Sequence, residues 1–565
     1  MTGDGGNEGN HITWEAVRPV FDTLLREPLT PTSMDGWLTR WSAAQKPLLE
    51  RRVVLLRACA GDLTDAAAEA AYAAFAAGTF APLEDANAAL RAKALALDGW
   101  DPAPAHREFL RQWRARAALD HPANGPVAAA IAAATRDYGR TVAAMRVELD
   151  GHAPDADELR RLASGPDRAT RERAWRASRE PWARARGDLD ILGLDLLARR
   201  RELARLAGMA DYRAHAWAGL ARLDYTPDDV LRFHDAVAEA FVPLAARRYE
   251  TRRRELGVPT LRPWDLEAEA GATTPLVPFS DLAAFAGAMA GVFARTDPEV
   301  GALYARMRGD FLDLGARPGK RGGGQVMVFP ESRLPFVLVS AGGSDIGIDL
   351  LLHEMGHAFH YALVMTPGFL VWQWEFPDEF TEFAAIAMTH FARPQLARAR
   401  GGFYDEAEMA RARRWYLDEL VVFGLPALSL ADRFEHWLYA EAPPDVGPRD
   451  LDAKWAELSA RYTPWADWSG LEDARDAGWQ RDEFLFIYPF YNLTYELGHI
   501  AALAVARRAQ HDAAGAWRAY RAALALGNSR PLPALFAAAG AHLPLDPAAV
   551  RDAARFLAEE LALTE

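Results

Sequence analysis

Two histidines and a glutamate within five residues could bind a metal ion and use it. His353-Glu354-Met355-Gly356-His357 is an HExxH pattern, and its surroundings predict a helix. Residues four apart lie one turn apart on the same helix face, so both imidazoles could bind one zinc ion at about 2.0–2.1 Å. Glu354 lies about 100° round the helix from His353, where it could hold a water molecule without binding the metal. We interpret Glu354 as a general base.

A catalytic zinc ion needs a third protein ligand and one open position. The stretch from Trp374 to His390 predicts a second helix that carries Glu375, Glu379 and Glu382 among apolar residues. Glu382 falls on the apolar side of this helix, where a carboxylate is costly unless a cation binds it. We therefore expect Glu382 to be the third ligand, with Glu379 as the alternative.

Three further residues could support such a site. Asp378 or Glu379 could orient the two histidines from outside the ligand set. His360 shares the ligand face three residues beyond His357, so it could lie beside the ligands or face the substrate.

Three tyrosines near the end of the chain could stabilise negative charge. Tyr488, Tyr491 and Tyr495 are spaced by three and four around Pro489, which predicts a row of phenol groups on one helix face. When water attacks a peptide carbonyl, negative charge develops on the oxygen, and phenolic donors stabilise it. By itself the pattern is more typical of an aromatic stripe in a protein core, so both interpretations are open at this point.

The elements that must position these residues are mostly helices. From Thr13 to about Asp310, apolar residues recur at spacings of three and four, which is typical of helices. Two runs between Gln325 and Ser340 are rich in β-branched and aromatic residues and predict a small β element. The HExxH helix should begin near Ser344, because a Gly-Gly-Ser turn leads there into an acidic residue.

The composition is that of a soluble globular protein and excludes several function classes. The 565 residues include 64 Lys and Arg against 78 Asp and Glu, a net charge of −14, with the basic residues scattered among acids. We therefore expect no nucleic-acid partner. No apolar run reaches the about 18 residues of a membrane span, and the N-terminal residues lack the pattern of a secretory signal, so we expect no membrane partner.

The single cysteine, Cys59, cannot form a disulfide within the chain or build a thiolate metal cluster. We expect a cytoplasmic protein whose zinc ligands are His and Glu side chains. The length alone suggests about four domains. Breaks rich in Pro and Gly occur at 257–278, 310–324 and 442–448, but none is a long flexible linker, so we expect no boundary between independent domains. Residues 1–12 are expected to be disordered.

Four segments carry a family resemblance. They are GKRGGG (319–324), PFVLVSAGGSDIGIDLLLHEMGHAFH (335–360), EFTEFAA (379–385) and PFYNLTYELG (489–498). With these segments the sequence resembles the thimet-oligopeptidase superfamily of zinc peptidases, specifically its oligoendopeptidase F branch. Weaker landmarks at 200–217 and 261–266 extend the resemblance over about 200 to 500.

The resemblance implies a mainly α, two-lobed metallopeptidase with a deep substrate channel and a small β-sheet beside the zinc site. Its lobes would be an N-terminal helical lobe, 13–195, and a catalytic lobe, 196–565, that pack as one unit. One Zn²⁺ ion would be bound by His353, His357 and Glu382, with Glu354 as general base. Tyr491 and Tyr495, together with Tyr488, would stabilise the transition state. An edge of the sheet within 325–340 would align the peptide as an added strand.

One departure from the family concerns a histidine that usually stands a few residues before the tyrosines. Here Phe484-Leu485-Phe486 occupies that place, and His499 lies on the far side of the tyrosines. Loss of one donor could cost about 10²- to 10³-fold in rate. The departure bears on efficiency and specificity more than on the type of reaction.

Together these features predict a zinc-dependent metalloendopeptidase that hydrolyses internal bonds of short unstructured oligopeptides, as a monomer or small homo-oligomer. One alternative is a zinc carboxypeptidase, which would need a cationic group for the terminal carboxylate of its substrate. Another is a peptide-binding homologue that has lost its activity. Mass spectra of the products distinguish an endopeptidase, which cuts internal bonds, from a carboxypeptidase, which trims the C-terminus stepwise. Zinc binding without turnover would favour the inactive peptide-binding homologue.

Overall fold

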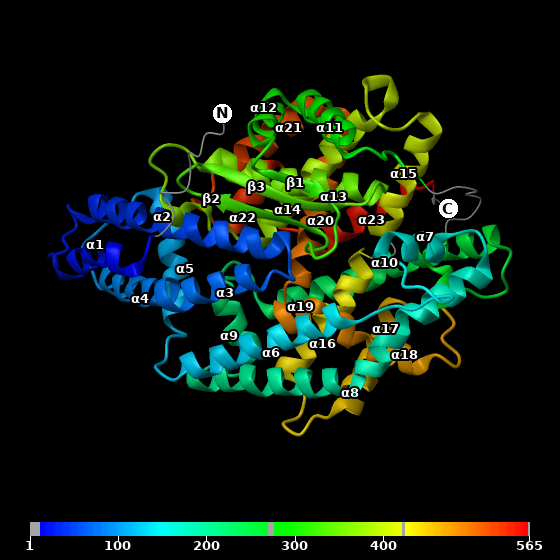
Figure 1. The fold of residues 1–565 in the computed structure, drawn as a ribbon, viewed down its shortest axis with the longest axis horizontal. Coiled ribbons are helices and arrows are strands. Elements are labelled where there is room, and N and C mark those ends of the chain that lie inside the picture. The colour runs from blue at the N-terminus through cyan, green and yellow to red at the C-terminus, as the bar shows by residue number, and fades with distance from the viewer. Residues whose placement is uncertain (1–11, 269–275, 421–423, 563–565) are drawn as a thin grey trace. The chain divides into compact units, whose positions relative to one another are not determined.

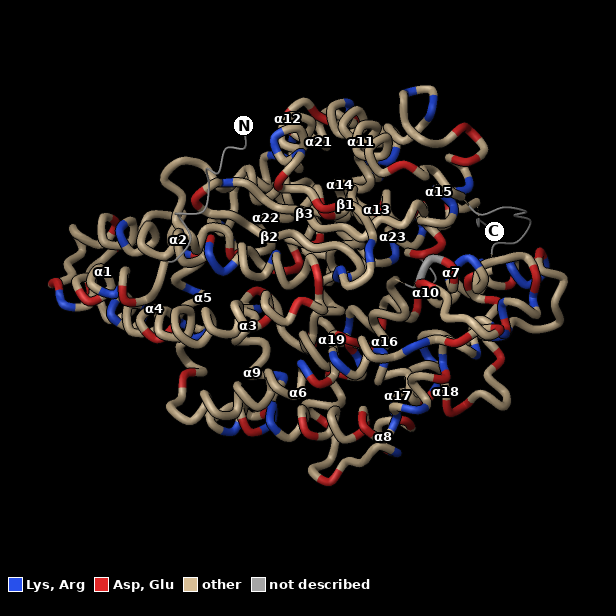
Figure 2. The backbone as a smooth tube through the Cα atoms, viewed as in Figure 1, with Lys and Arg blue, Asp and Glu red and all other residues tan. Residues whose placement is uncertain are grey.

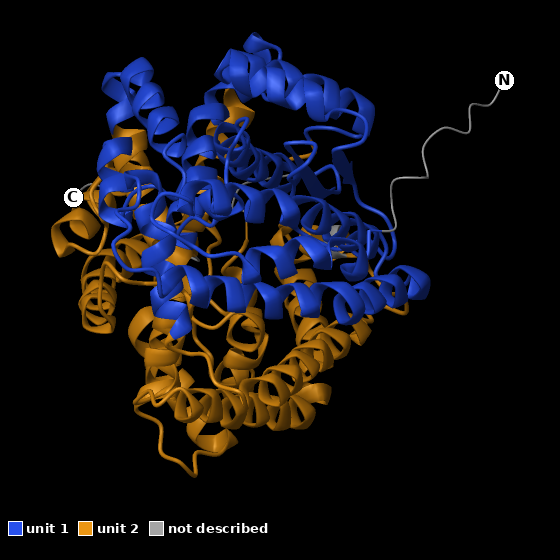
Figure 3. Ribbon diagram, turned by 90° about the vertical axis from the view of Figure 1, so that its left-hand side faces the viewer, with its two compact units in different colours: residues 1–117, 278–405, 508–540 blue, residues 118–277, 406–507, 541–565 orange. Residues whose placement is uncertain are grey.

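The computed structural model describes residues 12–268, 276–420 and 424–562, and it is mainly helical (Figure 1). The chain forms two compact units, each assembled from three segments that are far apart in sequence (Figure 3). Unit 1 comprises 1–117, 278–405 and 508–540, and unit 2 comprises 118–277, 406–507 and 541–565. This division differs from the expected lobes, 13–195 and 196–565. Residues 1–11 of the segment expected to be disordered lie outside the described residues.

Unit 1 contains the HExxH segment and the only sheet among the described residues. Its helices are α1 (Trp14–Arg26), α2 (Met34–Gly61), α3 (Ala66–Phe75), α4 (Ala81–Leu95), α5 (Arg107–Ala117), α11 (Leu282–Thr296), α12 (Pro298–Met307), α13 (Asp345–Val364), α14 (Asp378–Ala392), α21 (Ala513–Leu524) and α22 (Leu532–Ala539). Shorter helical turns are η1 (Ala76–Phe80), η2 (Pro104–His106), η4 (Val371–Trp374), η5 (Arg393–Leu396) and η6 (Arg398–Arg400). Its strands are β1 (Leu312–Gly315), β2 (Gly324–Phe329) and β3 (Leu334–Ala341).

Unit 2 contains helices and no β-strand among its described residues. Its helices are α6 (Asn124–Ala144), α7 (Ala156–Ser164), α8 (Arg168–Leu206), α9 (Tyr212–Gly219), α10 (Pro227–Glu255), α15 (Glu406–Glu419), α16 (Leu425–Ala440), α17 (Pro448–Tyr462), α18 (Glu472–Asp476), α19 (Glu483–Ile487), α20 (Asn492–His511) and α23 (Pro547–Glu560). The turns η3 (Pro263–Asp265) and η8 (Ala477–Arg481) complete it. The last turn of α20 belongs to unit 1.

The sheet of unit 1 has the strand order β1-β3-β2. β2 and β3 form an antiparallel hairpin in which Val326 pairs with Val337, so the β element expected within 325–340 is confirmed. β1 runs parallel to β3 and was not expected, because it lies in the 310–324 break and has only four residues. Its strand conformation depends on pairing with β3, which a local sequence pattern does not contain.

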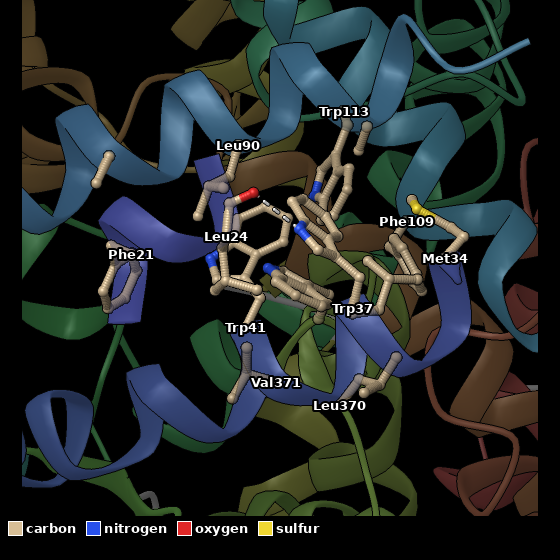
Figure 4. Close-up of a cluster of buried hydrophobic side chains, with 14 of the residues drawn as sticks. Phe21, Leu24, Met34, Trp37, Trp41, Leu90, Phe109, Trp113, Leu370 and Val371 are labelled. Carbon is tan, nitrogen blue, oxygen red and sulfur yellow. Dashed lines mark hydrogen bonds between the residues drawn. The ribbon is translucent and has the colours of Figure 1, made fainter. Parts of the chain in front are cut away.

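A cluster of buried aromatic side chains joins the N-terminal helices of unit 1 to the connection between α13 and α14. Figure 4 shows Trp37 and Trp41 of α2 packed with Trp113 of α5 and beside Val371 of the connection. The ring centroids of Trp41 and Trp372 lie 4.4 Å apart. The Ser42 hydroxyl accepts from the backbone N–H of Val371 at 3.0 Å. The connection is thus held by both apolar and polar contacts, which limits how the two helices it joins can move.

Charged side chains are interspersed along both units. Figure 2 shows acidic and basic residues mixed along the chain, in agreement with the scattered arginines of the sequence. Among the described helices, none combines the length and the hydropathy that crossing a membrane requires.

Candidate active site

The HExxH segment lies in the middle of α13. The helix begins at Asp345, directly after Ser344, as the Gly-Gly-Ser turn predicts. Buried residues occur on all sides of it, as the consecutive residues Ala358, Phe359 and His360 illustrate, which is the pattern of a core helix. A helix surrounded by packed neighbours presents His353 and His357 in fixed orientations.

The second helix, α14, begins at Asp378 after Pro377 and lies directly against α13. Gly356, between the two histidines, makes this contact possible. A Cβ atom at position 356 would lie 2.5 Å from the Cα of Ala385 and 2.8 Å from the carbonyl oxygen of Ala384, so a larger residue would push the helices apart. The close approach brings Glu382 on α14 to the two imidazoles on α13.

Three ligand atoms converge between these helices. His353 Nε2 lies 3.2 Å from His357 Nε2 and 3.2 Å from Glu382 Oε2. His357 Nε2 lies 3.7 Å from the same carboxylate oxygen. Ligands placed tetrahedrally at about 2.0–2.1 Å from a zinc ion would lie about 3.3–3.4 Å apart, so both the spacing and the donor types fit zinc.

Burial and the Glu382 carboxylate shift the pKa values of the two histidines in opposite directions. Burial lowers the pKa of His357 to about 4, so the ring is neutral near pH 7, the form that binds metals. Burial also lowers the pKa of His353, but the hydrogen-bonding Glu382 carboxylate outweighs it and raises that pKa overall. Glu382 thereby couples electrostatically to both histidines.

Glu354 lies next to the histidines but outside the converging set. The pKa of Glu354 is raised to about 7, mainly by burial; His353 opposes this rise, and the Glu382 carboxylate adds to it. A carboxylate with a pKa near the working pH is suited to accept and return a proton.

The first residue of β2 leaves room for the Glu354 side chain. A Cβ atom at Gly324 would lie 2.8 Å from both Cγ and Cδ of Glu354, so only glycine fits without displacing the carboxylate. Gly324 and Gly356 stand in the segments GKRGGG and HEMGH, and the spacing of the chemically reactive residues does not single them out. The signal was the residue type itself, because glycine is used where chain segments approach closely.

The other expected site residues of unit 1 differ in their surroundings. His360 is fully buried, and its ring stacks on Phe376 with centroids 3.7 Å apart and meets the edge of Phe380. Burial lowers the pKa of His360 to about 3. Glu379 is buried in the first turn of α14, and Asp378 beside it is partly exposed.

The three tyrosines belong to unit 2. The prediction that they lie on one face of a single helix is wrong. α19 ends at Ile487 and α20 begins at Asn492, so Tyr488 and Tyr491 lie in the turn between two helices. Pro489 in this turn lacks a backbone N–H, and Phe490 has φ +66°, outside the helical region. The rings nevertheless gather: centroids lie 6.1 Å apart for Tyr488 and Tyr491 and 5.5 Å apart for Tyr491 and Tyr495.

Buried charged side chains hold this turn in place. The N–H of Phe490 donates to Glu435 Oε2 at 2.8 Å, and its carbonyl accepts from the Arg222 guanidinium at 2.8 Å. Leu485, which stands where the resembling family has a histidine, is 5% exposed, and its carbonyl accepts from Arg200 at 2.6 Å. Leu485 is therefore part of the core of unit 2.

The model of one family, described as Peptidase family M3, matches residues 161–554 of the chain. The chain belongs to peptidase family M3. This M3 peptidase is accordingly a hydrolase of peptide bonds and a metalloprotease, and the family is generally metal-dependent. The resemblance drawn from the sequence motifs is confirmed.

Solved structures share the fold of the M3 peptidase along nearly its whole length. Pz peptidase A, solved with an inhibitor, is 20% identical, with a TM-score of 0.89 and coverage of 98% of this chain and 97% of that chain. A proposed oligoendopeptidase F from Bacillus anthracis is 19% identical, with a TM-score of 0.86 and coverage of 100% and 98%. Oligoendopeptidase-F from Enterococcus faecium is 16% identical, with a TM-score of 0.66 and coverage of 97% of each chain. A search of curated proteins finds no match.

Proposed function

We propose that this M3 peptidase is a zinc-dependent endopeptidase that hydrolyses internal bonds of short, unstructured oligopeptides. The observation that carries the proposal is the convergence of His353 Nε2, His357 Nε2 and Glu382 Oε2 beside the buried carboxyl group of Glu354. Two imidazoles, one carboxylate and an adjacent general base are the set that zinc peptidases require.

When bound, the zinc ion would polarise the scissile carbonyl and acidify the attacking water. Glu354 would accept a proton from that water and deliver it to the leaving amine. Its raised pKa suits both halves of this transfer, because the carboxylate must be a base in the first step and an acid in the second. Glu379 and Asp378 would support the ligands from the first turn of α14.

The sheet offers a means of holding an extended peptide. β2 lies at one edge of the three-stranded sheet, so one of its sides is not paired with β3. A peptide added along this edge would be held by backbone hydrogen bonds, which do not depend on the side-chain sequence. Gly324 at the start of β2 adjoins Glu354, so the same strand would carry the peptide toward the general base.

The role that we propose for the tyrosines rests on the family resemblance. Tyr491 and Tyr495 would donate to the oxygen that becomes negatively charged, and Tyr488 would assist them. The substrate channel and the oligomeric state, monomer or small homo-oligomer, stay predictions. We further propose a cytoplasmic location, since a chain with one cysteine needs no oxidising compartment.

Digestion of a peptide mixture of graded length tests the proposal. We expect internal cleavage of short peptides with zinc present and loss of cleavage after chelation, restored by added zinc. Mass spectra of the products identify the bond: stepwise trimming from the C-terminus would contradict the endopeptidase assignment and favour a carboxypeptidase. If the chelator leaves the cleavage rate unchanged and analysis finds no zinc bound to the protein, the metal assignment is contradicted.

A further inference from the structure

A second cluster of metal-ligating side chains lies within unit 2. His234 comes from α10, Asp432 from α16 and Glu496 from α20, and all three are fully buried. One ligand atom of each lies within 4.8 Å of the other two. Across the described residues, only this set and the set of His353, His357 and Glu382 meet that condition.

The spacing of the second cluster matches that of the first. His234 Nε2 lies 3.3 Å from Asp432 Oδ2 and 3.4 Å from Glu496 Oε1. In the first cluster the corresponding nitrogen-to-oxygen distances are 3.2 and 3.7 Å. Tetrahedral zinc ligands at about 2.0–2.1 Å would lie about 3.3–3.4 Å apart, so both nitrogen-to-oxygen distances of the second cluster fit a zinc site.

The orientation of these atoms favours a shared centre over hydrogen bonds. His234 Nε2, Asp432 Oδ2 and Glu496 Oε1 are all buried, and none has a partner with hydrogen-bond geometry. A ring N–H can point at one oxygen only, whereas this nitrogen lies almost equally far from two. Two carboxylates enclosed in a core are costly unless a cation neutralises them.

Neighbouring groups hold the three side chains from behind. The Ser429 hydroxyl donates to the other oxygen of Glu496. His436, one turn after Asp432 on α16, lies with Nε2 3.2 Å from Asp432 Oδ2. The Arg213 guanidinium lies 3.4 Å from Nδ1 of His436, and since arginine can only donate, the proton of a neutral His436 is on Nε2. Such outer contacts are typical of metal ligands.

We propose that His234, Asp432 and Glu496 bind a second divalent transition-metal ion, which joins α10, α16 and α20. One imidazole and two carboxylates suit zinc and its first-row neighbours, whereas calcium takes six to eight oxygen ligands. A divalent cation would balance the charges of the two carboxylates that bind it. This site goes beyond the peptidase function proposed above and does not rest on it.

Complete burial predicts how the second ion behaves. Its ligands are 0% exposed, whereas the side chain of His353 in the first cluster is 22% exposed. The second ion should therefore enter while the chain folds and should resist a chelator that removes the first. Its binding free energy would add to the stability of unit 2, because the unfolded chain has no such site.

Metal content of refolded protein tests the proposal. The parent chain and a His353→Ala/His357→Ala variant are refolded from urea with zinc, desalted and analysed for first-row metals, with folding checked by circular dichroism. We expect about two zinc ions per parent chain and about one in the double variant. Adding Asp432→Asn to the double variant should remove that ion, whereas adding Asp418→Asn should not. Asp418 is a matched control, because it is a buried carboxylate of unit 2 that pairs with Arg248.

A folded His353→Ala/His357→Ala variant without a bound first-row metal would overturn the proposal, whatever the peptidase activity of the parent. Equal metal content in the Asp432→Asn and Asp418→Asn variants would overturn the ligand assignment. If the Asp432→Asn variant does not fold, Glu496→Gln takes its place. The metal content of the His353→Ala/His357→Ala variant tests the second site without either substitution. A parent chain with a single ion that Asp432→Asn removes would support the second site and contradict the first.

Discussion

Glu354 owes its position to the absence of a side chain at Gly324. Its carboxyl group is buried against the start of β2, and a Cβ atom there would overlap it. Burial also sets its pKa near 7. The burial of the Glu354 carboxyl group against β2 thus determines both the position and the pKa of the proposed base.

Replacing Gly324 by alanine should displace Glu354 without disturbing the metal ligands. A shift of about 1 Å in a catalytic group can cost about 10²-fold in rate, so we expect kcat to fall by that order with unchanged zinc content. Steady-state kinetics and metal analysis measure both. Gly322→Ala is the control, because a Cβ atom there meets nothing within 4 Å. Equal activity of both variants would refute the role of Gly324.

Tyr491→Phe should lower kcat by about 10²- to 10³-fold with little change in KM, because a donor to the oxyanion acts only in the transition state. Tyr488→Phe should have a smaller effect, since Tyr488 is 57% exposed. Kinetics on one quenched-fluorescence peptide compare the variants. A fall in Tyr491→Phe confined to KM would assign the phenol to substrate binding instead.

The convergence of His353, His357 and Glu382 could be predicted from the sequence, since the HExxH spacing matches the helix period and a carboxylate among apolar residues is costly. The sequence does not predict the conformation around the tyrosines. The positive φ of Phe490 depends on hydrogen bonds from Arg222 and to Glu435, which are more than fifty residues away in sequence. The spacing of the tyrosines by three and four residues could not show that the chain leaves the helical conformation between α19 and α20.

At the scale of elements, the contact between α13 and α14 brings His353, His357 and Glu382 together. The helices and their approximate starts follow from local patterns, as Ser344 and Pro377 illustrate. Their mutual distance is set by Gly356, and the connection between them is fixed by Trp372 in the aromatic cluster of unit 1. Neither contact is encoded in a local pattern, and the same holds for β1.

Gly356→Ala should separate α13 from α14 and weaken metal binding. Overpacking costs about 1–3 kcal/mol, and displacement of Glu382 should lower zinc affinity. Urea unfolding and competition with a chelator measure the two effects. Gly287→Ala in α11 is the control: its Cβ atom meets nothing within 4 Å, so we expect a gain of about 0.5–1 kcal/mol. Unchanged zinc affinity in Gly356→Ala would contradict this account of the helix contact.

A buried ion pair of unit 2 should make stability depend on pH. Asp265 in η3 is fully buried and accepts from Arg171 at 2.9 Å and from Arg168 at 2.7 Å. Burial alone would raise the pKa of Asp265, but hydrogen bonds from Arg168, from the Arg262 backbone and from Arg171 outweigh it and lower that pKa overall. Because the folded pKa lies below the unfolded value of about 3.9, the pair stabilises above that pH, and this contribution is lost as pH falls through the folded pKa.

Asp265→Asn should therefore cost about 3–5 kcal/mol near pH 7, because it leaves Arg171 buried without its counter-charge. The difference from the parent in urea unfolding should shrink as pH falls from about 5 toward 3. Asp137→Asn, in an exposed pair with Arg140, should cost less than about 1 kcal/mol. A pH-independent difference for Asp265→Asn would contradict the pKa assignment.

At the scale of the whole molecule, the sequence predicts a mainly helical chain without independent domains, but it does not predict the two units. Each unit combines three distant segments, for example 1–117 with 278–405. Helical periodicity shows that a face is apolar and not which helix covers it. Trp41 and Trp372, more than three hundred residues apart, share one cluster for reasons that only the folded chain reveals.

The central claim is that Glu354 is the base of a zinc peptidase, and the Glu354→Gln variant tests it most directly. The measurement is zinc content and turnover of an internally cleaved peptide on the same preparation. We predict zinc content equal to that of the parent and turnover lower by at least about 10²- to 10⁴-fold, the usual contribution of a general base. Cleavage at the parental rate by zinc-loaded Glu354→Gln would contradict the account.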